Sequence, residues 1–280
     1  MLLLRSSELP AADSWLRELK FDGYRAIAFK ADNKLHLRSR RNKDFTTRFP
    51  EVANALQSLP DNTVVDGEIV ALDVEGRPSF NLLQNYKSSR NPIVFYLFDL
   101  LILSGRNIMD RNLGERRGLL ERKVLPKLNE PVRYSPELTS PLSDLIQAIK
   151  AQGFEGVVAK DRNSLYQPGL RTGAWRKLRI NSGQEFVIGG YTVGGSTFDG
   201  LIFGYYKGDA LIFAARTRSG FRSGRWGQGL TAAKMKDCRW LKPVLVGQFE
   251  FTEWTPVGHL RHSKFGTLRQ DKKARNVRRE

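Results

Sequence analysis

The sequence predicts an α+β domain followed by a small β-barrel, with the boundary near residues 180–185. Three observations support this division. The first part of the chain combines helix and strand patterns, whereas after Arg179 it holds only short strands separated by glycine-containing turns. The 280 residues can form one large domain or two ordinary ones, and a hydrophobic fraction of 40% is enough for real cores. About 95 residues of short strands correspond to the OB-fold size class, a small barrel.

The first domain contains two stretches that alternate in the manner of strands, residues 25–38 and 63–73. In the second stretch, the period of two places Asp66 and Glu68 on one face of the strand. The other face is apolar: Val65, Ile69 and Ala71. Two carboxylates on one face among apolar residues indicate the floor of a site.

Two helices and a buried strand complete this domain. We expect the first helix between Pro50 and Pro60, with an apolar stripe of Val52, Leu56 and Leu59. The second helix has Ser140 as its N-cap and Gly153 as its stop, and its stripe is Leu142, Leu145, Ile146 and Ile149. The nearly continuous apolar run from Ile93 to Leu103 predicts a buried strand.

The second domain is expected to be all-β. Its predicted strands are Glu185–Tyr191, Ile202–Tyr206, Leu211–Arg216 and Val246–Trp254. The last eight residues, Lys273 to Glu280, are basic and predict a disordered terminal arm.

The composition narrows the class of protein. Lys and Arg number 46 against 29 Asp and Glu, for a net charge of +17 and a pI near 10.2. This excess favours a polyanionic partner, most simply nucleic acid, and a merely soluble, basic protein is the alternative from charge alone. The single cysteine, Cys238, excludes an intramolecular disulfide and a cysteine-based zinc cluster. We identify no signal peptide and no membrane-spanning run of about 20 apolar residues, so we expect a cytoplasmic protein.

Six short blocks occur in a fixed order along the chain. The first is Lys20-Phe21-Asp22-Gly23-Tyr24-Arg25, a K-x-D-G-x-R hexad. The others are Asp66-Gly67-Glu68, Phe98-Asp99, Glu155–Lys160, Trp175–Arg179 and Arg269–Lys272. The hexad alone is a modest signal, but the ordered set is specific.

This set resembles the covalent nucleotidyltransferases, the superfamily of DNA ligases, RNA ligases and mRNA-capping enzymes. The likeness runs from about Trp15 to the C-terminus. The resemblance implies a nucleotidyltransferase (adenylation) domain with antiparallel sheets and flanking helices over residues 1–183, and an OB-fold domain over residues 184–280. It also implies that Lys20 becomes covalently attached to a nucleotide.

A lysine nucleophile must be neutral, yet at a pKa of about 10.4 only around one lysine in 2,500 is neutral at pH 7. Nearby positive charge or desolvation is needed to lower that pKa. The same cations would stabilise the charge that develops on the α-phosphate and pyrophosphate. The candidates are Arg25, Arg40, Lys160, Lys177 and Arg179.

The resemblance gives roles to further residues. Glu68 is implied to contact the ribose, and Glu68 and Glu155 are the implied metal ligands. Because Glu155 and Lys160 are five residues apart, we expect Glu155 at the entry of a strand rather than within it. Phe98 alone reads as a core aromatic, whereas its counterpart in the family stacks on the nucleobase. Phe21 is an ordinary core or surface candidate.

Three more positions match residues near the nucleotide. Glu18 matches a position next to the adenine, Arg40 an arginine that touches the nucleotide or nick phosphate, and Arg171 an arginine that orders the site. After Arg40 the family's usual Asn-Gly is Arg41-Asn42, and Asn42 is expected to keep the left-handed turn.

The last two blocks are implied to serve the phosphates. In Lys177-Leu178-Arg179, Lys177 is the preferred phosphate ligand, since Arg179 is a planar fork rather than a point charge. Arg269 and Lys272 match an element that orients the pyrophosphate during lysine adenylation and then turns away.

Further sequence segments narrow the resemblance to the ATP-dependent DNA ligases. Residues 184–191, 254–256 and 260–269 look like the ligase module of bacterial ligase D, which joins broken ends with the Ku protein. The sequence has no four-cysteine zinc motif of NAD-dependent ligases, so ATP is the expected donor. The expected partners are nicked or broken duplex DNA, Mg²⁺ or Mn²⁺ and Ku, for a protein that is a monomer in the bacterial nucleoid. The competing hypotheses are a GTP-dependent capping-type guanylyltransferase and a non-enzymatic nucleic-acid-binding module.

Overall fold

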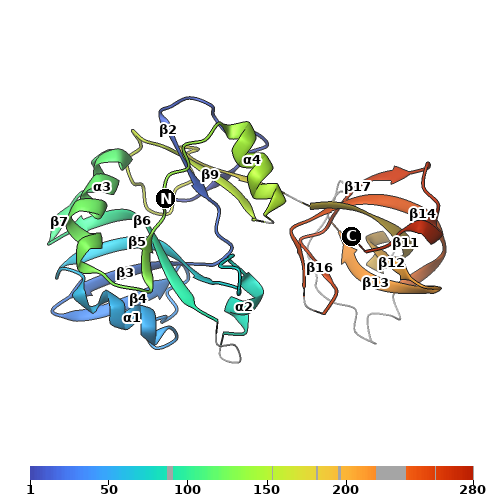
Figure 1. Ribbon diagram of the computed structural model, residues 1–280, viewed down its shortest axis with the longest axis horizontal. Helices are drawn as coiled ribbons and strands as arrows, with labels where there is room; N and C mark the ends of the chain where they lie inside the picture. The colour runs from blue at the N-terminus through green and yellow to red at the C-terminus, as the bar shows by residue number, and fades with distance from the viewer. Residues whose placement is uncertain are drawn as a thin grey trace. The chain divides into compact units, whose positions relative to one another are not determined.

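The computed structural model describes residues 1–86, 91–152, 154–180, 182–194, 197–218, 238–255 and 257–279. The chain forms two compact units, unit 1 from Met1 to Ile180 and unit 2 from Asn181 to Glu280. In Figure 1, unit 1 runs from blue to yellow-green and unit 2 continues to red. None of the helices in the described ranges is long and apolar enough to cross a membrane.

The larger sheet of unit 1 has the order β4-β3-β5-β6-β7, and β8 pairs with β6 in parallel. Its strands are β3 (Tyr24–Ala31), β4 (Lys34–Ser39), β5 (Thr63–Ala71), β6 (Ile93–Leu103), β7 (Arg106–Asn107) and β8 (Val132–Tyr134). The predicted buried strand is confirmed as β6. The alternating stretch 25–38 is a hairpin of two strands, because Asp32 and Asn33 adopt left-handed φ values of 50° and 58° and turn the chain.

The two faces of β5 differ as its alternation predicts. Val65, Ile69 and Ala71 belong to the main core, together with Val52 and Leu56 from the first helical segment. Asp66 and Glu68 therefore point to the opposite face of the sheet.

The smaller sheet of unit 1 has the order β1-β10-β9-β2. Its strands are β1 (Leu4–Arg5), β2 (Trp15–Leu19), β9 (Gly156–Asp161) and β10 (Trp175–Arg179). β9 pairs antiparallel with both β2 and β10, and β1 pairs parallel to β10. The register places Glu18 and Lys177 on either side of Val158. The fourth and fifth sequence blocks therefore pair in this sheet, and the first block begins at Lys20, directly after β2.

Helices cover the two sheets of unit 1 (Figure 1). They are α1 (Pro50–Ala55) with η1 (Leu56–Ser58), α2 (Phe80–Gln84), α3 (Leu113–Leu119) with η2 (Leu120–Val124) and η3 (Leu125–Lys127), and α4 (Leu142–Ala151). Both predicted helices are present. The prediction of Ser140 as an N-cap is wrong: Pro141 is the cap residue of α4, with ψ of 144° and no side-chain cap hydrogen bond. The predicted stop, Gly153, lies outside the described residues.

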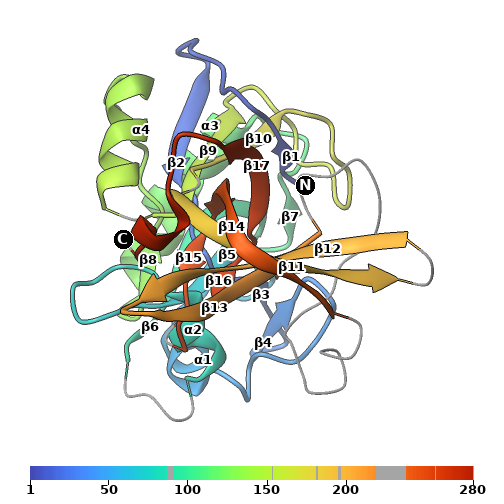
Figure 2. The ribbon, with the colours of Figure 1, turned by 90° about the vertical axis from the view of Figure 1, so that its right-hand side faces the viewer.

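Unit 2 is an antiparallel sheet of order β13-β12-β11-β14-β17 with a separate β15–β16 pair (Figure 2). The strands are β11 (Ser182–Gly194), β12 (Thr197–Lys207), β13 (Ala210–Thr217), β14 (Cys238–Phe251), β15 (Glu253–Trp254), β16 (Leu260–Arg261) and β17 (Lys264–Arg269). They are longer than the sequence predicts: the strand predicted over Glu185–Tyr191, for example, extends to Gly194 in β11. A Cβ on Gly190 would come within 2.7 Å of the Arg239 carbonyl oxygen, so this glycine permits a close strand approach at a bulge.

The prediction of a disordered basic arm at the C-terminus is wrong for residues 273–279, which the structure describes. The helical turn η4 (Ala274–Asn276) follows β17, and Ala274 and Val277 are buried in the core of unit 2. The Tyr206 amide donates a hydrogen bond of 2.9 Å to the Val277 carbonyl. Two apolar side chains and one backbone contact anchor a segment whose composition is dominated by charge.

Candidate active site

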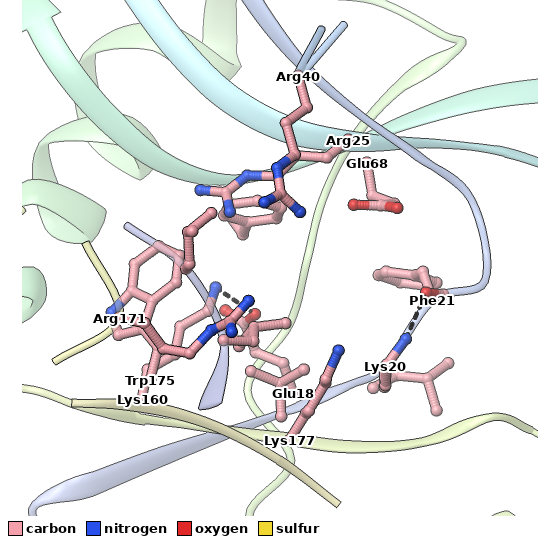
Figure 3. Close-up of a pocket in the computed structure, with 15 residues that line it drawn as sticks. Glu18, Lys20, Phe21, Arg25, Arg40, Glu68, Lys160, Arg171, Trp175 and Lys177 are labelled. Atoms are coloured by element: carbon pink, nitrogen blue, oxygen red, sulfur yellow. Dashed lines mark hydrogen bonds and ion pairs between the residues drawn. The ribbon is translucent and has the colours of Figure 1, made fainter. Parts of the chain in front are cut away.

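Unit 1 contains a pocket lined by residues from both of its sheets (Figure 3). Nine of the predicted site residues line it: Glu18, Lys20, Arg25, Arg40, Glu68, Phe98, Lys160, Arg171 and Lys177. The remaining lining residues are Leu2, Leu3, Leu19, Phe21, Val158 and Trp175.

Lys20 stands directly after β2 at the end of the smaller sheet. Its backbone amide donates to the Gly156 carbonyl at 2.9 Å, which fixes the lysine beside the start of β9. Its Nζ donates to the Glu155 carboxylate and, at 3.4 Å, to the Phe21 carbonyl. Figure 3 shows the ammonium group of Lys20 beside Phe21 at the edge of the pocket.

Glu155 precedes β9, as its spacing from Lys160 predicts. The next residue must be glycine, because a Cβ on Gly156 would lie 2.0 Å from the Leu178 carbonyl oxygen. This close approach holds Glu155 between Lys20 and Arg179, whose Nε is 2.9 Å from Oε1. Burial raises the pKa of Glu155, and Lys20 opposes that rise.

The metal-binding prediction rests on Glu68 and Glu155. Across the residues that the structure describes, no group of three or more His, Cys, Asp or Glu side chains is placed to hold a metal ion. The carboxylate of Glu68 has no hydrogen-bond or ion-pair partner among those residues, and burial raises its pKa to about 8. A half-buried carboxylate without such a partner fits a cation ligand. The carboxylate of Glu155 is paired with Lys20 and Arg179, so it would have to release Lys20 before it could bind a cation.

Arg25 connects β5 to the N-terminal residue of the chain. Its Nε and Nη2 donate to Asp66 at 3.0 and 2.5 Å, and its Nη1 donates to the Met1 carbonyl at 2.6 Å. Asp66 also accepts a 2.8 Å hydrogen bond from Tyr166. The guanidinium group is therefore held by protein partners within the described residues.

A second carboxylate–cation pair lies deeper in the pocket. Lys160 Nζ donates to Glu18 at 2.6 Å and lies 4.0 Å from the ring centroid of Phe98 and 4.5 Å from that of Trp175. Phe98 and Trp175 pack edge to face at 6.0 Å. Phe98 belongs to a buried cluster and also lines the pocket.

Three other cations line the pocket without such partners. Arg40, Arg171 and Lys177 make no ion pair or hydrogen bond through their side chains within the described ranges, and Figure 3 shows them around the cavity. Burial lowers the pKa of Lys177, and the charges of Lys20 and Arg179 lower it further. Asn42, two residues after Arg40, has φ of 57°, which confirms the left-handed turn.

The remaining predicted residues lie elsewhere. Arg179 contacts Glu155 and does not line the pocket. Arg269 and Lys272 belong to unit 2, where Glu185 pairs with both at 2.8 and 3.3 Å and Asp271 pairs with Arg269.

Several of the lining residues are not predicted from the sequence. Phe21, an ordinary core or surface candidate from the sequence, follows Lys20 directly and stacks on Tyr96 with the ring centroids 4.3 Å apart. Trp175 sits inside the fifth block, and its place in that block was an available signal. Leu2 and Leu3 reach the pocket because β1 pairs with β10, a contact across about 170 residues that no local pattern reveals.

Comparison with known proteins identifies the family of this chain. Residues 8–179 match the family described as ATP dependent DNA ligase domain, and residues 194–272 match the ATP dependent DNA ligase C terminal region. The chain therefore belongs to the ATP-dependent DNA ligase family. The predicted nucleotidyltransferase and OB-fold architecture is confirmed.

Several relatives are multifunctional non-homologous end joining proteins named LigD. The one from Mycobacterium bovis is 35% identical over 294 residues, covering 96% of this chain and 38% of the relative. The one from Pseudomonas aeruginosa is 33% identical over 96% of this chain and 35% of the relative. The chain thus spans little more than a third of these relatives.

Solved structures give the same picture. Mycobacterial DNA ligase D complexed with ATP and MES superposes with a TM-score of 0.59 at 32% identity, covering 100% of this chain and 97% of that one. The ligase domain of Mycobacterium tuberculosis LigD gives 0.58 at 33% identity, covering 99% and 97%.

Proposed function

We propose that this protein seals breaks between a 5′-phosphate and a 3′-hydroxyl in duplex DNA, with ATP as the donor, during repair or end joining. The observation that carries the proposal is the position of Lys20 at the edge of a pocket lined by five other cations: Arg25, Arg40, Lys160, Arg171 and Lys177. Such a pocket suits a nucleoside triphosphate whose α-phosphate lies next to the lysine.

In the first step, Nζ of neutral Lys20 forms a bond to the α-phosphorus of ATP as the bond to the bridging oxygen breaks, and pyrophosphate leaves. The lysyl-AMP then transfers AMP to the 5′-phosphate at a break. The 3′-hydroxyl finally attacks that activated phosphate and AMP is released. Lys20 regains its free amine when the AMP is transferred, so it acts only in the first two steps.

The proposal assigns a nucleotide contact to most of the predicted residues. We assign Phe98 and Glu18 to the adenine and Glu68 to the ribose, and the unpartnered Arg40, Arg171 and Lys177 to the phosphates. We assign Arg269 and Lys272, from unit 2, to the pyrophosphate, with Arg179 beside Lys20 as further positive charge. A divalent cation, Mg²⁺ or Mn²⁺, would be held by Glu68 and Glu155 and would neutralise charge on the triphosphate.

The net charge of +17 suits contacts with the phosphates of duplex DNA, which fix position without reading sequence. By analogy with the end-joining relatives, we propose that the protein acts on broken DNA in the bacterial cytoplasm as a monomer, with Ku as its partner at the ends.

The test is a mass spectrum of the protein after incubation with Mg²⁺ and either ATP or GTP. We expect an AMP adduct on Lys20 with ATP, no adduct with GTP and none in Lys20→Ala. A GTP adduct would indicate a capping-type transferase, and no adduct with either nucleotide would refute the proposal.

A further inference from the structure

Helix α3 carries two consecutive arginines, Arg116 and Arg117, that lie outside all six sequence blocks. Their exposed fractions are 0% and 3%. A buried guanidinium group is tolerated only when its donors are paired, so the partners of each arginine show what it holds in place.

Arg117 forms hydrogen bonds with two residues that line the pocket. Its Nη1 donates to the Glu18 carboxylate and, at 3.0 Å, to the Phe98 carbonyl, and its Nη2 donates to the Ser135 carbonyl at 2.8 Å. The ring of Tyr134 lies 4.5 Å from its Cζ and covers one face of the guanidinium group.

The contacts of Arg117 reach a third pocket residue through Glu18. One oxygen of that carboxylate accepts from Arg117, and the other accepts from Lys160. Lys160 in turn lies over the Phe98 ring. One guanidinium group therefore fixes Glu18, Lys160 and the backbone of Phe98, which come from the three different strands β2, β9 and β6.

Arg116 has the same burial and the same helix but different partners. Its Nε and Nη2 donate to Asp99 at 2.9 and 2.8 Å, and its Nη1 donates to the carbonyls of Arg111 and Ser164. None of these partners lines the pocket. Arg116 is thus a matched control for the loss of a buried, paired arginine.

We propose that Arg117 is a positioning residue for the nucleobase end of the pocket: it touches no nucleotide itself but sets the places of Glu18, Lys160 and Phe98. The inference rests on the proposed function, in which these three residues surround the adenine. Arg116 holds Asp99 and stabilises unit 1 without this effect on the ligand.

The conservative variant Arg117→Lys keeps the charge but replaces a planar fork by a single ammonium group, which cannot reach three acceptors in different directions. The three N–H donors of an ammonium group diverge from one nitrogen, so they cannot bridge Glu18, the Phe98 carbonyl and the Ser135 carbonyl as the two separate Nη atoms of Arg117 do. We expect the dissociation constant for ATP to rise about tenfold, the equivalent of one lost charged hydrogen bond. The KM for ATP in adenylation should rise in parallel, and kcat should change less because Lys20 is untouched.

The experiment compares Arg117→Lys with Arg116→Lys. ATP dissociation constants are measured by calorimetry in a Lys20→Ala background, where no covalent adduct forms, and thermal melting records the stability of each variant. The expected result is that both variants melt earlier but only Arg117→Lys binds ATP more weakly. Equal ATP affinity in the two variants, whether both are unchanged or both weakened, would overturn the inference.

A milder pair covers the case in which Arg117→Lys does not fold. Tyr134→Leu removes the ring that covers Arg117, and Tyr134→Phe keeps it, while both lose the same hydroxyl group. We expect weaker ATP binding in Tyr134→Leu than in Tyr134→Phe, and equal binding overturns the inference. Failure of the proposed function would look different, because wild-type protein would then form no AMP adduct whatever the variants bind.

Discussion

Replacing Glu68 by Gln should stabilise the fold at neutral and alkaline pH while it damages the site. Burial raises the pKa of Glu68 from an ordinary 4.5 to about 8, although Lys20 and Arg25 oppose the rise. A carboxyl group whose pKa is higher in the folded than in the unfolded state destabilises the fold when it ionises. The penalty is absent below about pH 4.5, grows through neutral pH and is complete above about pH 8.

The size of the effect follows from the two pKa values. The interval from 4.5 to about 8, at 1.36 kcal/mol for each pH unit, gives an upper limit of about 5 kcal/mol above pH 8. Glu68 faces a pocket that is open to solvent, so water screens part of this penalty, and we expect a gain of about 1–2 kcal/mol at pH 8 in Glu68→Gln. Because Glu68 has no partner among the described residues, the amide breaks no hydrogen bond.

The assay is urea unfolding between pH 5 and pH 8.5, followed through hydrogen exchange of peptides from β5 and β6, so that it reports on unit 1 alone. The difference between Glu68→Gln and wild type should be small at pH 5 and should grow with pH. Glu51→Gln, an exposed carboxylate on α1, is the matched control and should show a constant difference. A difference for Glu68→Gln that stays constant or shrinks toward pH 8 would show that Glu68 is not held in a penalised state.

Three further predictions concern the reaction. Lys20→Ala should abolish AMP attachment while sealing of a pre-adenylated nick stays measurable; adduct formation at the wild-type rate would contradict the role of Lys20. Arg269→Ala or Lys272→Ala should slow adenylation far more than sealing of pre-adenylated DNA, and equal losses in both steps would limit these residues to DNA binding. A plot of the logarithm of the DNA-binding constant against the logarithm of the salt concentration should be linear, with a slope of about −0.9 for each phosphate that the protein contacts. Deletion from Gln184 onward should flatten this slope, while scrambling the sequence around the nick should change affinity little; a salt-independent affinity would point to another substrate.

The elements that the sequence predicts well are those with a strong local pattern. β6 is a continuous apolar run, and β5 alternates so clearly that the orientation of Asp66 and Glu68 follows from the period of two. Local patterns fail where a weak signal competes with tertiary contacts. In the basic C-terminal segment only two small apolar residues, Ala274 and Val277, are buried in the core. The composition of this segment is dominated by charge, so composition alone predicts disorder.

The site was predictable to the extent that ordered blocks carry it. Those blocks contain six of the nine predicted residues that line the pocket, because the same chemistry needs the same side chains in the same order, and the family resemblance adds Glu18, Arg40 and Arg171. They do not identify Leu2 and Leu3, which arrive through strand pairing, nor Arg117, which acts from a helix behind the pocket. Residues that shape a site without touching its ligand leave no pattern in a single sequence.

The cations of the pocket fall into two groups with different physical roles. Lys20, Arg25 and Lys160 have carboxylate partners, so their positions are set before any ligand arrives. Arg40, Arg171 and Lys177 have no such partner within the described part of the chain. Burial, and then the charges of Lys20 and Arg179, lower the pKa of Lys177. A bound triphosphate would supply negative charge to these side chains. The cations of the pocket repel one another in the free protein, and relief of this repulsion would favour binding of the triphosphate. ATP binding should therefore raise the pKa of Lys177, because the triphosphate gives this side chain the negatively charged partner that it lacks in the free protein. As a result, the protein should take up protons when it binds ATP above neutral pH.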